Sequence, residues 1–189
     1  LRVRESRLGG IIGVDGGIDA MRRDLFESLR ADQLPDFVQP LKVAEKGFAV
    51  VFEPAAVVRE TAHQDARHEW AMRVRVALRA MHALRDMQHL LDPRRDAMLA
   101  FKLWSHKLLR YHAFMPLGGL ALSSLWLAPT AGPYALALLV QVGFYALAYL
   151  GFRHEAQVRR SALLGVPYYF TLLNLACAQA FWRFLRGRK

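Results

Sequence analysis

The sequence has 189 residues, of which 54% are hydrophobic and 22% are charged, and its formal net charge is +10. Its single cysteine, Cys177, excludes an intrachain disulfide and a zinc site built from several cysteines. Charged side chains occur throughout residues 1–110 but are missing from 113–152 and from 161–182. The chain is therefore predicted to have a polar half and a membrane half.

Glycines dominate residues 9–17, "GGIIGVDGG", directly before a segment predicted to be an amphipathic helix, residues 17–30. The apolar positions of that helix are Ile18, Met21, Leu25 and Leu29. A glycine-rich turn before a helix can bind phosphate through its backbone N–H groups, but this turn matches neither the dinucleotide fingerprint nor the P-loop. A plain tight turn is the alternative.

Asp36 lies at the start of the next predicted helix, residues 36–46, which Gly47 ends. Residues 48–54, "FAVVFEP", follow as a predicted strand that a proline stops. An aspartate in the first turn of a helix accepts backbone hydrogen bonds and complements the helix dipole. Asp36 is therefore either a helix-capping residue or, in the context of other motifs, a catalytic carboxylate.

Residues 57–87 are predicted to form a long basic amphipathic helix that leads toward the membrane half. Its apolar positions recur at helical spacing and are Trp70, Val74, Ala77, Leu78, Met81 and Leu84. Its arginines include Arg67, Arg73, Arg75 and Arg79. These guanidinium groups are suited either to lie along phospholipid headgroups or to bind a diphosphate.

Three membrane spans are predicted, near residues 111–128, 133–152 and 161–182, because a bilayer core of about 30 Å needs roughly 20 apolar residues per helix. The uncharged turn "APTAGP" at 128–133 separates the first two spans.

Basic residues crowd the sequence just before the first predicted span and just after the second, so the positive-inside tendency places residues 1–110 in the cytoplasm. A third full span conflicts with that tendency, because it carries a basic tail to the outer side. The tail consists of Arg183, Arg186, Arg188 and Lys189. The conflict disappears if residues 161–182 are re-entrant or if a further element returns the chain.

The order of these elements resembles that of membrane-bound family 2 glycosyltransferases, in which a cytosolic GT-A catalytic domain precedes interfacial and transmembrane helices. The family's glycine turn with A-x-R-R, its acidic pair and its G-y-x-v-x-y-x-P-x-A segment are similar to "GGIDAMRRDLF" at 16–26, "PDF" at 35–37 and "GFAVVFEPAA" at 47–56. The interfacial motif of the family, in its relaxed R-x-V-R form, resembles "MRVRV" at 72–76, and "SHKLLRYHAFMPL" at 105–117 resembles its pre-membrane segment.

The resemblance implies site residues. Asp36 aligns with the catalytic base, which takes the proton of the attacking sugar hydroxyl, although Pro35 replaces the first acid of the family's pair. Met72 and Val76 also depart from the interfacial motif, where the family has glutamine and tryptophan. The substrate-binding residues that the resemblance implies are Arg75, as the arginine beside the leaving diphosphate, with Arg73, Asp15, Gly16 and Gly17.

The implied fold class is α+β, with a partial GT-A glycosyltransferase domain followed by an interfacial helix and about three transmembrane helices. Residues 1–62 are then the C-terminal part of the GT-A domain, 63–110 the basic interfacial helices and 111–189 the transmembrane region. The implied localisation is the inner (plasma) membrane, as a multi-pass protein whose catalytic part is cytoplasmic.

The implied function is inverting transfer of a sugar, of the hexosyltransferase type, from a nucleotide-sugar donor to a glycan or lipid-linked acceptor for cell-surface polysaccharide synthesis. Membrane lipids are expected partners and nucleic acid is not, because the basic residues follow the membrane boundary. The family implies a divalent metal, Mg²⁺ or Mn²⁺, but its D-x-D motif does not occur in these 189 residues. The chain alone is therefore expected to be inactive. The alternative is a non-catalytic membrane adaptor whose basic helix binds anionic lipid or a partner subunit.

Overall fold

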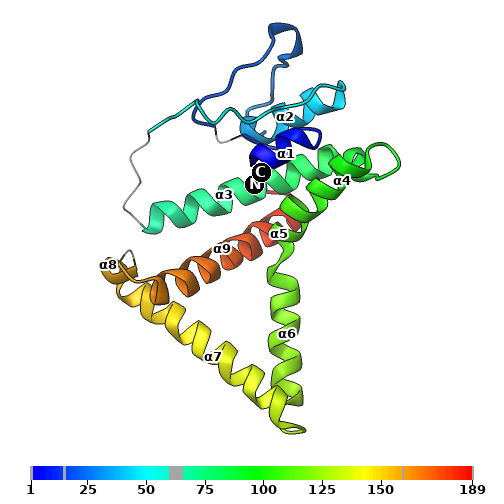
Figure 1. Cartoon of the computed structure of the whole chain (residues 1–189). Coiled ribbons are helices and arrows are strands. Elements are labelled where there is room, and N and C mark those ends of the chain that lie inside the picture. Colours follow the sequence, from blue (N-terminus) through cyan, green and yellow to red (C-terminus); the bar gives the residue numbers. More distant parts are fainter. Residues whose placement is uncertain (1, 15, 60–65, 159, 189) are drawn as a thin grey trace. The chain divides into compact units, whose positions relative to one another are not determined.

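The structure is a computed structural model that describes residues 2–14, 16–59, 66–158 and 160–188 (Figure 1). It divides the chain into two compact units. Unit 1 contains residues 1–110 together with 180–189, and unit 2 contains residues 111–179. All regular secondary structure within the described ranges is helical.

Unit 1 is built from short helical segments around two longer helices. Its elements are α1 (Arg2–Arg7), η1 (Arg23–Leu25), α2 (Pro35–Glu45), α3 (Ala66–Asp86), η2 (Gln88–Leu91), α4 (Ala97–Leu103) and the π-helical segment η3 (Trp104–Leu108). Asp36 lies in the first turn of α2, and Gly47 follows the helix with φ of +81°. The predicted helix at 36–46 and its glycine stop are therefore confirmed.

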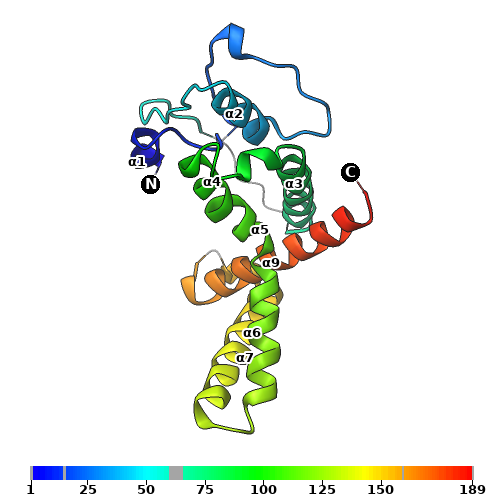
Figure 2. The same ribbon diagram turned by 90° about the vertical axis from the view of Figure 1, so that its right-hand side faces the viewer.

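The core of unit 1 forms where α2 packs against α3 (Figure 2). Phe37, Val38 and Leu41 are almost fully buried on α2. The buried residues of α3 are Val74, Ala77, Leu78, Ala80, Met81, Ala83 and Leu84. The apolar face of α3 thus belongs to the protein core, and its exposed residues include Ala71, Arg75, Arg85 and Asp86.

The predicted α+β class with a GT-A domain is wrong, because no strand forms in the part of the chain that the structure describes. Residues 48–53 have no regular secondary structure, and residue 54 begins a turn. Their backbone contacts with the N-terminal segment include Ile11 N–H donating to Val50 O at 2.7 Å and Phe52 N–H donating to Ser6 Oγ at 2.8 Å. An extended segment needs a paired neighbour to satisfy its backbone groups as a sheet, and these contacts are too few for a ladder.

The helix predicted at 17–30 is also wrong, since only the single turn η1 is helical there. Leu25 is buried, whereas Ile18, Met21 and Phe26 are exposed. A short helix in water depends on packing of its whole apolar face, and here only one of the four predicted apolar positions is buried.

Unit 2 contains α6 (Phe114–Leu127), α7 (Gly132–Arg153) and the single turn α8 (Glu155–Val158), with α5 (Leu109–His112) leading into it. Helix α9 (Ala162–Leu185) begins in unit 2, and its last turns belong to unit 1. Helices α6 and α7 form a hairpin (Figure 1). Gln141 Nε2 donates to Ser124 Oγ at 2.9 Å within it.

The prediction of three spans is wrong, because two helices, α7 and α9, are both long and apolar enough to cross a membrane among the described residues. Helix α6 has 14 residues, or about 21 Å of helix, which is shorter than a bilayer core of about 30 Å.

Two adjacent glycines allow a direct test of how the N-terminal segment packs. Gly9 and Gly10 have φ of +89° and +95°, but a Cβ on Gly9 meets nothing within 4 Å, whereas a Cβ on Gly10 lies 2.9 Å from Val50 O. We expect Gly10→Ala to lower the free energy of unfolding by about 1–3 kcal/mol more than Gly9→Ala, because both changes share the backbone strain and only one adds the clash. Denaturant unfolding of the detergent-solubilised chain measures the difference, and equal losses contradict the contact.

Candidate functional site

Asp36 is the second residue of α2, after Pro35. Proline suits the first helical position because the N–H that it lacks has no partner within the helix. The helix has no side-chain cap from Leu34, so the carboxylate of Asp36 complements the positive end of the helix dipole. The side chain of Asp36 is half-buried. The carboxylate of Asp36 can therefore have a structural role in the first turn and still be accessible to a substrate.

Gly16 lies directly against this carboxylate. A Cβ on Gly16 would be 2.7 Å from Oδ2 and 3.0 Å from Oδ1 of Asp36. Gly16 also has φ of +76°, a conformation that residues with a Cβ rarely adopt. Position 16 thus favours glycine for two separate reasons, and the Asp36 carboxylate faces bare backbone.

A backbone hydrogen bond and close packing hold the glycine-rich segment in place on α2. Val14 N–H donates to the backbone oxygen of Asp36 at 2.9 Å. A Cβ on Gly13 would lie 3.5 Å from the same oxygen. The segment that carries Gly16 is therefore fixed to the helix that carries Asp36.

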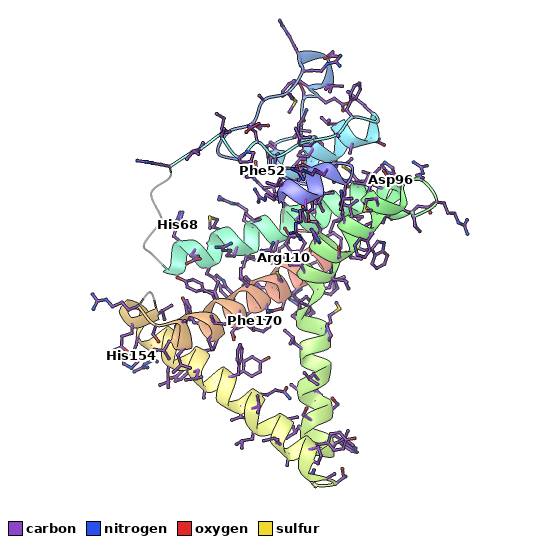
Figure 3. All side chains as sticks on the ribbon, in the orientation of Figure 1. Phe52, His68, Asp96, Arg110, His154 and Phe170 are labelled. Atoms are coloured by element: carbon purple, nitrogen blue, oxygen red, sulfur yellow. The ribbon has the colours of Figure 1, made fainter. Side chains whose placement is uncertain are left out.

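Lys102 anchors the chain that leads into this segment. Its side chain is buried, and its Nζ donates to the backbone oxygens of Leu8 and Gly10, each at 2.7 Å. The helix that carries Lys102, α4, is capped by Asp96, whose Oδ1 accepts from the N–H groups of Met98 and Leu99 at 2.9 Å (Figure 3). A buried ammonium is tolerated only with such acceptors, so Lys102 ties the N-terminal segment to α4.

Lys107, on the π-helical segment η3, points its ammonium at the same region. Its Nζ lies 4.4 Å from the ring centroid of Phe37 and 3.2 Å from where a Cβ on Gly13 would be. Its ammonium makes no hydrogen bond or ion pair with any residue that the structure describes. Burial first, and then the positive charges of Arg110 and Arg2, lower the pKa of Lys107 from 10.5 to about 8, while Asp36 acts in the opposite direction.

The two predicted arginines lie on α3 and differ from each other. Arg73 is half-buried, and its Nη2 donates to Glu69 Oε1 at 3.2 Å. Arg75 is exposed, and within the described ranges its side chain has no hydrogen bond or ion pair. Neither arginine bonds to Asp36 in that part of the chain. The structure therefore joins Gly16 to Asp36 but leaves the arginines apart from them in its contacts.

The structure gives no contact with Asp36 for the other two predicted residues, Asp15 and Gly17. Asp15 lies outside the described residues. Gly17 follows Gly16 on an exposed turn.

A divalent metal has no evident set of ligands here. No group of three or more His, Cys, Asp or Glu side chains gathers in the ranges that the structure describes. At the candidate site, one carboxylate stands near an ammonium, which does not fit a cation that takes six or more oxygen ligands. Binding of Mg²⁺ or Mn²⁺ stays a prediction, and its ligands are expected to be groups other than these side chains.

Sequence reasoning missed Lys102 and Lys107 as parts of this region, because both belong to the run of basic residues that precedes the membrane half. Their spacing of five residues does not bring two side chains to one face of a regular α-helix. The π-helical segment Trp104–Leu108 changes the angle between successive side chains around the helix axis. The periodicity of the sequence did not indicate a π-helical segment.

No protein-family model matches this chain, and neither a curated protein nor a solved structure matches it. The candidate site is therefore defined by its own geometry.

The pKa of Lys107 gives a prediction with a definite sign. Between about pH 8 and 10.5 the unfolded chain keeps the proton of Lys107 and the folded chain has lost it, so stability should rise with pH across that window. Replacing Lys107 with methionine keeps an apolar stem over Phe37 and should remove this rise, which thermal unfolding at a series of pH values measures. Acetylation of the Lys107 amine, followed by mass spectrometry, should be half-maximal near pH 8. A midpoint near 10.5 contradicts the burial of the ammonium.

Proposed function

We propose that this chain carries the proton-accepting carboxylate and the membrane anchor of an inverting glycosyltransferase. The donor is a nucleotide-diphosphate sugar, and the acceptor is a glycan or lipid-linked hydroxyl at the cytoplasmic face of the inner membrane, in the synthesis of cell-surface polysaccharide. The observation that carries the proposal is the contact of Gly16 with the Asp36 carboxylate. It brings together residues from two of the segments, 16–26 and 35–37, on which the sequence resemblance rests.

The chemistry asked of Asp36 is proton transfer. As the acceptor oxygen forms its bond to the anomeric carbon, the bond from that carbon to the diphosphate breaks, and the hydroxyl proton passes to the carboxylate. Displacement from the opposite face inverts the anomeric configuration. Within the described part of the chain, the Asp36 carboxylate has no hydrogen bond or ion pair, so both of its oxygens can accept a proton.

Positive charge near the site also supports the proposal. The ammonium of Lys107 interacts electrostatically with Asp36 and, with a pKa of about 8, is mostly protonated at neutral pH. Arg75 is exposed on α3 and is free to meet a diphosphate, whereas Arg73 is already paired with Glu69. Of the two predicted arginines, Arg75 is therefore the better partner for the leaving group.

Membrane attachment is supported by the length and apolar composition of α7 and α9, whether each helix crosses the bilayer or lies at its surface. A lipid-linked or membrane-extruded acceptor requires an enzyme held at the membrane surface. The multi-pass arrangement and the inner membrane are parts of this proposal.

A membrane adaptor is the second candidate, and one surface favours it. Phe101 and Trp104, on α4 and η3, are 66% and 46% exposed. Arg94 and Arg95, just before α4, are exposed as well. Exposed aromatic rings next to arginines suit the interface of an anionic bilayer without any catalytic role.

The test compares two aspartates at helix N-termini. In membranes that contain the full-length gene product, we expect Asp36→Asn to lower nucleotide-sugar turnover by about 10² to 10⁴-fold, because the amide cannot accept the proton. Asp96→Asn is the matched control, since Asp96 caps α4 and asparagine caps equally well, so its turnover should stay unchanged.

Unchanged turnover in Asp36→Asn contradicts its role as the base and returns it to a structural role. Absence of turnover in the unsubstituted protein across a panel of nucleotide sugars favours the adaptor. The 189-residue chain by itself is expected to form no product.

A further inference from the structure

The C-terminal end of α9 is attached to α3 within unit 1. His82 Nε2 donates to the backbone oxygen of Arg188 at 2.9 Å, which requires the proton to be on Nε2 because a carbonyl can only accept. The Phe184 ring lies 4.9 Å from the His82 ring and 5.4 Å from the guanidinium carbon of Arg85. Three separate contacts thus hold the end of α9 in the unit that contains residues 1–110.

The opposite end of α9 is attached to the end of α7 within unit 2. A Cβ on Gly151, near the end of α7, would lie 2.9 Å from Tyr168 Cβ and 3.2 Å from the Leu164 backbone oxygen. A Cβ on Gly165 would lie 2.9 Å from the Val158 backbone oxygen. The close packing at these two glycines fixes the start of α9 beside the end of α7.

The hairpin of α6 and α7 determines on which side of a membrane the start of α9 lies. A helical hairpin returns to the side from which it departed, whether it passes through the bilayer or only enters it. Arg110 precedes the hairpin and Arg153 ends it, whereas the turn at 128–131 is uncharged. Basic residues at both open ends and none at the turn agree with this orientation.

From these contacts we infer that α9 begins and ends on the membrane side that holds residues 1–110, so that it lies in the bilayer interface and does not cross. Its 24 residues extend about 36 Å, so length alone permits a span. The contacts of Phe184 and Arg188 with His82 on α3 exclude a span, because a crossing helix would separate these residues.

The side chains of α9 divide between a face that packs on the protein and a face that is exposed. One stripe, at a spacing of four residues, is buried in the protein and consists of Tyr168, Leu172, Ala176 and Ala180. The exposed apolar residues include Leu163, Val166, Leu175, Trp182 and Leu185. Apolar side chains of an interfacial helix enter the acyl boundary, while its basic residues stay at the headgroups. Arg183, Arg186 and Arg188 then remain on the side of the other membrane-edge arginines.

The decisive experiment compares the sidedness of two positions in the full chain. In a Cys177→Ala background, single cysteines replace Arg188, at the end of the chain, or Arg94, an exposed residue before α4 in the same unit. Sealed vesicles of one orientation are treated with a membrane-impermeant maleimide before and after permeabilisation. We expect both cysteines to be labelled under the same conditions. Labelling of the two from opposite faces would overturn the inference.

A depth measurement gives an independent result. Nitroxide-labelled cysteines at Leu163, Leu175 and Leu185, all exposed on α9, should report similar shallow depths in the bilayer. A profile that is deepest at position 175 and shallow at both ends shows a crossing helix and contradicts the inference. Neither measurement depends on enzymatic activity, so its outcome is separate from that of the proposed glycosyl transfer.

Discussion

The buried ammonium of Lys102 is the interaction on which the candidate site depends. A buried charge is costly unless acceptors surround it, and here the acceptors are the backbone oxygens of Leu8 and Gly10. Because those residues lead directly into the glycine-rich segment, fixing them on α4 also determines where Gly16 reaches α2. The contact between Gly16 and Asp36 is therefore made by tertiary structure across long sequence separations, and is not a local feature of either segment.

Local rules were sufficient for α2. Proline at its first position, aspartate in its first turn and glycine after its end are signals that act within a few residues, and the helix begins and ends close to where they indicate. The same signals also placed Asp36 in a first turn without any knowledge of its surroundings. What they could not reveal is that a glycine some twenty positions earlier leaves the carboxylate against bare backbone.

Predictions failed for segments whose structure depends on contacts with residues far away in the sequence. The apolar run at 48–54 has the composition of a strand, but a strand exists only with a neighbour that pairs its backbone, and none is described. The apolar spacing at 17–30 suits a helix, yet Ile18 and Met21 are exposed. The positions of Lys102 and Lys107 beside the glycine-rich segment were equally invisible, since the π-helical segment Trp104–Leu108 alters the periodicity on which sequence-based prediction relies.

Membrane topology shows the same limit most clearly. Mean hydropathy treats α9 as an isolated helix, and by that measure both α7, at 1.8, and α9, at 1.2, are apolar enough to cross a bilayer. Whether a helix crosses depends instead on where its two ends are held, and the end of α9 is held by His82, 106 positions before Arg188 in the sequence. That contact also removes the charge conflict that a third span created, because the C-terminal arginines then need no translocation. A short-range pattern can identify an apolar helix, but a long-range contact decides what the helix does in the bilayer.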